Sequence, residues 1–82
     1  MDSTLEKNIA RELKIDLKGI GVPEGAAVSF VDNIIADTKK ALKGKNVVTE
    51  KDLTRIVARE AKKYNPDLAY VYKNRDKIIS NG

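Results

Sequence analysis

The chain lacks side chains on which many protein activities depend. Its 82 residues include no cysteine, no histidine and no tryptophan, and aromatic residues make up only 5%. Without cysteine no disulfide supports the fold, and nothing points to an oxidising compartment. The commonest general base and the usual zinc ligands are both missing, so we expect no metal site. No apolar run approaches the roughly 20 residues of a membrane span, and we expect a soluble, cytoplasmic protein with no membrane partner.

The positive charge is concentrated in the second half of the chain. The formal net charge is +4, from 16 Lys and Arg against 12 Asp and Glu. Residues 1–43 carry seven side chains of each sign, whereas residues 44–82 carry nine basic and five acidic ones. Such an asymmetry attracts polyanions, although many ordinary soluble domains carry as much charge.

The first helix is predicted from a capping signal and an apolar stripe. Ser3 and Glu6 have the spacing of a capping box, which predicts a helix over about residues 4–14 that runs on to about Leu17. The segment "LKIDLKGIGV", which starts at Leu13, has a second interpretation, because its apolar and polar residues alternate with the period of a strand. A short extended segment at residues 13–18 therefore stays open. The stripe consists of Leu5, Ile9 and Leu13.

The second helix is predicted between Pro23, which suits a first helical turn, and Gly44, which suits a C-cap. Lysines crowd its last turn, where cations meet the negative end of the helix dipole. Val28 and Phe30 widen its apolar arc, so we expect this helix to be the most buried one. The expected core face consists of Ala27, Val31, Ile34, Ile35, Thr38 and Leu42.

The third helix is predicted to begin after Thr49, its N-cap, with Asp52 completing an acidic capping box. A short extended segment at residues 46–48 is expected before it. The expected core stripe consists of Leu53, Ile56, Val57 and Ala61.

The fourth helix is predicted to follow Asn65, an N-cap, with Pro66 in the first position and Asp67 at the positive helix end. The sequence therefore predicts a single all-α domain over residues 1–82, a small four-helix orthogonal bundle. The buried side of the last helix is expected to consist of Leu68, Val71, Tyr72, Ile78 and Ile79.

No recognisable catalytic set accompanies these helices. The glycines of "KGIGVPEG" do not have the spacing of a phosphate-binding loop or a dinucleotide fingerprint. Half of the carboxylates fall at helix starts, where capping and dipole roles explain them, so we expect a non-enzymatic protein without catalytic residues. These carboxylates belong to Asp2, Glu6, Glu24, Glu50, Asp52 and Asp67.

A basic surface is the strongest candidate for a binding site. Four basic residues follow helical spacing on the third helix, and two more lie on the fourth beside an outward Tyr70. Such a surface holds phosphates by Coulomb attraction and counterion release, and a tyrosine stacks on an exposed base. The alternative is an ordinary solvated face, partly neutralised by Glu60 or Asp76. The basic residues are Lys51, Arg55, Arg59 and Lys62, followed by Lys73 and Lys77.

The other two tyrosines are expected to be structural. Tyr72 falls on the apolar side of the fourth helix, so we expect it in the core. Tyr64 ends the third helix and is expected to fasten it to the fourth. Buried tyrosines usually find a hydrogen-bond partner at the edge of the core.

The segment "VVTEKDLTRIVAREAKKYNPDLAYVYKNRDKI" resembles the C-terminal helical part of the ATP-cone, the regulatory nucleotide-binding domain of ribonucleotide reductases and their repressor. Thr49 opens the helix as in that family, Leu53 and Val57 occupy its apolar pair, and Ala69 and Tyr72 keep its last spacing. With "AAVSFVDNIIADTKKAL" as the preceding helix, the resemblance covers about residues 26–78. It implies ATP or dATP as a ligand.

The chain also departs from the ATP-cone pattern. Arg75 stands where the family has a second aromatic residue, and Asp76 stands where it has arginine. The β-hairpin half of the ATP-cone, with its basic turn, has no counterpart in residues 1–25. A second resemblance, of "NVVTEKDL" to the start of the last histone-fold helix, fits less well because the second helix is several turns too short.

The sequence thus predicts a binding or regulatory module with a basic face for an anionic partner, a degenerate ATP-cone-like nucleotide sensor. A small nucleic-acid-binding protein and a protein–protein interaction module remain open. No cofactor is expected apart from the ATP or dATP that the resemblance implies. A homodimer also stays open, because so small a chain often completes its core by pairing.

Overall fold

The computed structural model describes residues 3–44 and 49–74. Those residues form helices and turns and contain no strand, which confirms the predicted all-α, four-helix fold. The four helices are α1 (Ser3–Gly19), α2 (Glu24–Leu42), α3 (Glu50–Lys62) and α4 (Pro66–Lys73).

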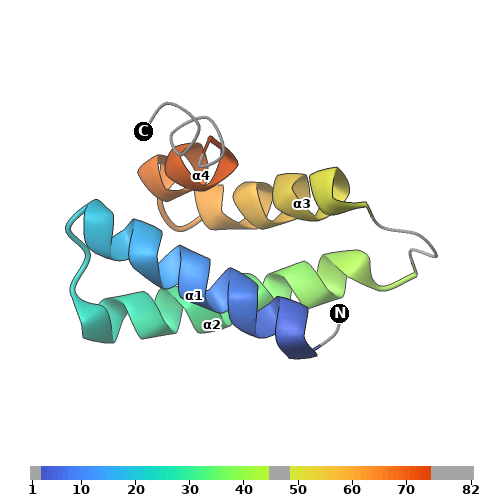
Figure 1. Cartoon of the computed structure of the whole chain (residues 1–82), viewed down its shortest axis with the longest axis horizontal. Coiled ribbons are helices and arrows are strands. Elements are labelled where there is room, and N and C mark those ends of the chain that lie inside the picture. Colours follow the sequence, from blue (N-terminus) through green and yellow to red (C-terminus); the bar gives the residue numbers. More distant parts are fainter. Residues whose placement is uncertain (1–2, 45–48, 75–82) are drawn as a thin grey trace.

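The helices are arranged as two hairpins, one on the other. Helices α1 and α2 lie side by side and run in opposite directions, and α3 and α4 form the second pair above them in Figure 1. Helix α3 packs against α2, and α4 packs against α1. The core therefore lies between the hairpins, and none of the four helices covers the outer side of either hairpin.

All four helices contribute to one hydrophobic core. Leu13 of α1, Ile34 of α2 and Leu68 of α4 are completely buried, as their spacing predicts. Burying a side chain of this size stabilises a fold by about 1.5–3 kcal/mol. The core cluster consists of Ile9, Leu13, Leu17, Ala27, Val31, Ile34, Ile35, Leu53, Val57, Ala58, Ala61, Leu68, Ala69 and Tyr72.

Helix α1 continues through the segment for which an extended alternative was open. Residues 13–18 are helical, so that alternative is wrong. The alternation arises because Ile15 points away from the core while Asp16, on the core side, is buried. The helix ends where Gly21 takes a φ of +89°, a conformation that glycine adopts readily. There the backbone N–H of Val22 donates to the carbonyl of Leu17, at 2.9 Å.

Several expected details of the first two helices are wrong. Leu5 and Val28 are exposed and lie outside the core. Pro23 occupies the N-cap of α2 rather than its first helical position. Ser3, which was expected to cap the helix, is already the first residue of α1. The carboxylate of Glu6, which was expected to complete the capping box, forms an ion pair with Lys39 of α2 at 2.9 Å. The ion pair links the two helices of the hairpin.

The predicted caps of α3 and α4 are confirmed. The Thr49 hydroxyl accepts a hydrogen bond from the Asp52 amide at 3.1 Å, and the Asp52 carboxylate accepts one from the Thr49 amide at 3.4 Å. The Asn65 side chain accepts from the amides of Asp67 and Leu68, at 2.9 and 3.2 Å. These bonds satisfy amides that a helix N-terminus leaves without intrahelical partners.

The end of α2 also follows its prediction. Gly44, with a φ of +84°, directly follows the C-cap residue Lys43. The expected extended segment at 46–48, and Ile78 and Ile79 of the expected core, lie outside the described residues. None of the helices in residues 3–44 and 49–74 is long and apolar enough to cross a membrane.

Candidate functional site

The four basic residues predicted on α3 lie on one exposed face of that helix. Their spacing of four, four and three residues keeps them on one side, and each is exposed. Because a helix rises 1.5 Å per residue, they form a line about 17 Å long. We call this line the α3 strip; it consists of Lys51, Arg55, Arg59 and Lys62.

The strip faces solvent because the rest of α3 is covered. Leu53, Val57 and Ala61 are buried on the other side of the helix, where α3 packs against α2 and α4. Two acidic residues of α3, Glu50 and Asp52, sit in its first turn, and two basic ones, Arg59 and Lys62, sit in its last turn. This distribution also suits the helix dipole, which accounts for part of the charge pattern without any ligand.

Local ion pairs occupy the two arginines only in part. A terminal nitrogen of Arg55 lies 3.4 Å from the Asp52 carboxylate, and the Nε of Arg59 lies 3.1 Å from the Glu60 carboxylate. A guanidinium carries five N–H donors, so most donors of each arginine remain for another partner. Lys51 and Lys62 form no ion pair with any described residue.

Glu60 is a buried carboxylate beneath the strip. It is 4% exposed, and besides Arg59 it accepts a hydrogen bond from the Nζ of Lys63 at 2.7 Å. The bond from Lys63, and then that from Arg59, lower the pKa of Glu60 although burial acts in the opposite direction. The expected neutralisation by Glu60 is thus confirmed for Arg59. Its burial was not predicted; Asp76, the other candidate, lies outside the described residues.

Helix α4 places two further predicted residues at the surface. Tyr70 is 69% exposed, and Lys73, three residues later, is exposed too. The opposite side of α4 is buried, and there Tyr72 lies in the core, as predicted. Lys77 lies outside the described residues. Both side chains therefore extend into solvent from the helix that packs against α3.

Tyr64 fastens α3 to α2, so the expected attachment to the fourth helix is wrong. Its O–H donates to the Asp37 carboxylate at 2.7 Å, and the centroid of its ring lies 6.1 Å from that of Phe30. Asp37 and Phe30 both belong to α2. The hydrogen bond to Asp37 raises the pKa of Tyr64 because ionisation would place two negative charges together. This attachment fixes the C-terminal end of α3, and with it the orientation of the strip.

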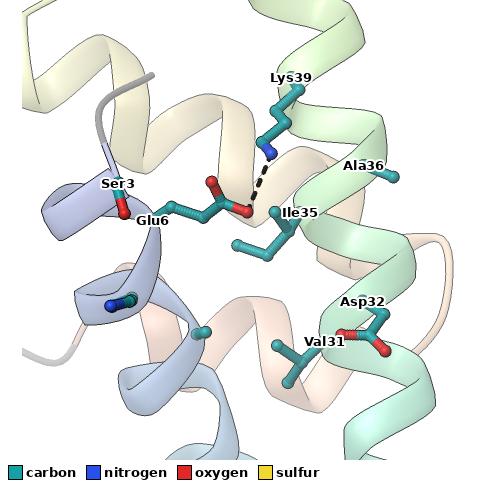
Figure 2. Close-up of a pocket in the computed structure, with 9 residues that line it drawn as sticks. Ser3, Glu6, Val31, Asp32, Ile35, Ala36 and Lys39 are labelled. Carbon is teal, nitrogen blue, oxygen red and sulfur yellow. Dashed lines mark ion pairs between the residues drawn. The ribbon is translucent and has the colours of Figure 1, made fainter.

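Two cavities lie elsewhere, between α1 and α2. The larger, of about 420 Å³, is open and is bridged by the Glu6–Lys39 ion pair; Figure 2 shows α1 on one side of it and α2 on the other. The smaller, of about 270 Å³, is lined by Lys14, Ile15 and Lys18 of α1 and by Val22, Glu24 and Ala27. Neither is lined by a predicted site residue. The sequence signal for the smaller one was Ile15, an apolar residue off the core stripe.

The described residues 3–44 and 49–74 contain no cluster of three acidic, histidine or cysteine side chains that could hold a metal ion. The chemistry of the α3 strip is that of anion binding: cationic N–H donors in a row on a rigid helix. No protein-family model, no curated protein and no solved structure matches this chain.

Proposed function

We propose that this domain is a non-enzymatic, cytoplasmic binding module that holds a nucleic acid strand against the α3 strip. The strip carries the proposal because it lines up four exposed cations over about 17 Å. A duplex of that length presents about ten phosphates, at one charge per roughly 1.7 Å of axis. An extended polyanion therefore engages all four cations at once, whereas a single small anion reaches only one or two.

The arginines suit phosphate binding despite their local pairs. Exposed pairs such as Arg55–Asp52 contribute little to stability, about 0–1 kcal/mol, so a phosphate competes with Asp52 at low cost. Arg59 keeps its terminal nitrogens while its Nε holds Glu60. Those nitrogens are the ones that form two parallel bonds to a phosphate.

Helix α4 favours a single strand over a duplex. Tyr70 presents its ring to solvent on the helix that packs against α3, and an exposed ring stacks on an unpaired base. Lys73, on the same side, supplies a further cation. We expect Tyr70→Ser to weaken binding of single-stranded DNA or RNA by about 1 kcal/mol or more, and to leave duplex binding unchanged.

The test is nucleic acid binding, followed by fluorescence anisotropy over a series of salt concentrations. With four phosphate contacts, the log–log slope of affinity against salt for duplex DNA should be about −3.6, at about −0.9 per contact. The double variant Lys51→Gln with Lys62→Gln should reduce the magnitude of this slope by about 1.8, because two of the four contacts are lost. These lysines are chosen because neither contacts Glu60, so the fold is preserved.

The matched control is Lys14→Gln with Lys18→Gln. It removes the same charge from exposed positions on α1, far along the chain from the strip. The control should keep the wild-type slope. An equal loss of slope in both double variants would show attraction to net charge only, and an unchanged slope in the α3 variant would refute the site.

Nucleotide sensing, the property that the ATP-cone resemblance implies, makes a different prediction. An NMR titration with ATP at physiological ionic strength screens weak surface attraction, since the Debye length is then about 8 Å. Under our proposal ATP produces weak, unsaturated amide shifts along α3 and α4. Saturating shifts confined to one small group of amides would replace the nucleic acid proposal with a nucleotide site. If the protein responded to neither ATP nor nucleic acid, the protein–protein interaction module would be the one remaining alternative of the three.

A further inference from the structure

The two cavities described above follow each other along the α1–α2 hairpin, one beside residues 3–10 of α1 and the other beside residues 14–18. Each has one wall from α1 and one from α2. Lys7, Lys14 and Lys18 follow helical spacing along the α1 wall. On the α2 wall, Glu24 and Asp32 are eight residues, or just over two turns, apart. We call this feature the outer groove; Figure 2 shows its larger cavity between the two helices.

The second hairpin packs on another side of these helices. Helix α2 meets α3 through Phe30 and Asp37, the partners of Tyr64, and neither residue lines a cavity of the groove. In Figure 2 the ribbons of α3 and α4 pass behind the groove. Neither α3 nor α4 therefore covers the groove, as far as residues 3–44 and 49–74 show.

The two walls of the groove carry opposite charge. Lys14 and Lys18 stand on the α1 wall, and Glu24 and Asp32 stand on the α2 wall. None of these four forms an ion pair with a described residue. At the other end of the groove the acidic residue, Glu6, lies on α1 and the basic residue, Lys39, lies on α2, but these two neutralise each other. The groove thus presents a basic edge and an acidic edge with unused charge on each.

Apolar side chains stand between these charges. Ile15 on α1 is 57% exposed, and Val28 on α2 is 41% exposed. Val28 lies one turn after Glu24 and one turn before Asp32, so it shares their side of α2. Both walls therefore carry exposed apolar surface beside charge, the composition of an interface that is more polar than a core.

We propose that the outer groove binds a second copy of this chain. A two-fold axis parallel to the hairpin places α1 of one copy over α2 of the other, at matching heights. In that arrangement Lys18 faces the partner's Glu24 and Lys14 faces the partner's Asp32. Between them Ile15 packs on the partner's Val28. Every contact occurs twice, because a two-fold interface pairs a surface with itself.

The area available is that of a small interface. Helix α1 has 17 residues and is about 25 Å long, and two helices 8–10 Å apart cover a width of about 20 Å. The footprint is then roughly 500 Å² per copy, or about 1,000 Å² in total, near the lower limit for a specific interface. We expect a reversible dimer with a dissociation constant of about 0.1 mM.

The experiment is sedimentation velocity on the full chain, tenfold above and below that concentration. The wild-type mass should rise from 9.1 kDa toward twice that value. Lys14→Glu with Lys18→Glu makes both edges acidic, and Glu24→Lys with Asp32→Lys makes both basic. Each double variant should remain monomeric because like charges then face each other.

Mixing the two double variants provides the decisive result. In the mixed pair the acidic α1 edge faces the basic α2 edge, and the two wild-type edges of opposite charge face each other as well. The mixture should therefore form a heterodimer at least as readily as the wild type forms its dimer. Circular dichroism checks that each variant keeps its helix content.

A charge-reversed control on the other hairpin completes the design. Lys51→Glu with Lys62→Glu makes the same number of changes on α3 and should leave dimerisation intact. A wild-type chain that stays at 9.1 kDa throughout would overturn the proposal. Dimerisation of either groove variant alone, or a mixture that fails to associate, would overturn it equally.

Discussion

Replacing one buried hydroxyl should stabilise this protein. Thr38 lies in α2, is completely buried, and its Oγ1 has no hydrogen-bond partner within the part of the chain that the structure describes. Burying an unpaired hydroxyl costs about 1–3 kcal/mol in proteins. Thr38→Val replaces the hydroxyl with a methyl group of similar size, and the two residues have nearly equal helix propensity.

We therefore expect Thr38→Val to raise the free energy of unfolding by about 1 kcal/mol or more. For a domain of this size each kcal/mol raises the Tm by about 4–8 °C. Total stability is expected at about 4–12 kcal/mol, so the change is readily measured by urea unfolding and thermal melting. Thr38→Ser, which keeps the hydroxyl and loses a methyl group, should destabilise the fold by about 1 kcal/mol.

The matched control is Thr54→Val on α3, where the side chain is only half-buried. Its hydroxyl reaches water in the folded and the unfolded protein, so the free energy of unfolding should change by less than about 0.5 kcal/mol. A neutral or destabilising Thr38→Val would show that the Thr38 hydroxyl has a partner in solution and would refute the argument.

Two further predictions concern single side chains. Glu60 has a lowered pKa, so its stabilising effect is complete above the ordinary glutamate value of 4.5 and is lost as the pH falls through the folded-state value. Glu60→Gln should therefore cost about 1 kcal/mol at neutral pH, a modest figure because both cationic partners are largely exposed, and nothing in strong acid. Thermal melts over a pH series check this, and a pH-independent difference would contradict it. Asn65→Ala should cost about 1 kcal/mol by removing the two hydrogen bonds of the α4 cap. Urea unfolding measures that loss, with Asn33→Ala on the exposed side of α2 as the control.

The features that the sequence predicted correctly are those that depend on neighbouring residues. The caps at Thr49 and Asn65 were predictable because the side chain and the amides it satisfies lie within three residues of each other. The core stripes were predictable for the same reason, since helical spacing alone sorts Ile9 and Leu13 to one side.

The features that were missed depend on which helices meet. Tyr64 was expected to fasten the third helix to the fourth, but its partner Asp37 is 27 positions earlier in the chain, and no local pattern connects them. Glu60 looked like one more surface charge, but the packed helices leave it only 4% exposed. Ile15 produced a strand-like alternation because an outward apolar residue and an inward carboxylate, Asp16, follow each other on one helix. The basic residues of α3 could be placed on one face in advance, whereas the groove between α1 and α2 could not.

The order in which helices meet has a consequence for how fast the chain folds. Each helix packs on the next one in sequence, and the contact of α1 with α4 is the only pairing of helices that are not consecutive within the described residues. Each hairpin is therefore able to form by closing a short loop, and only the docking of one hairpin on the other joins distant parts of the chain. Domains dominated by such local pairings fold within microseconds to milliseconds. The slowest step should be that docking, in which Tyr64 meets Asp37 and the two halves of the core close on each other.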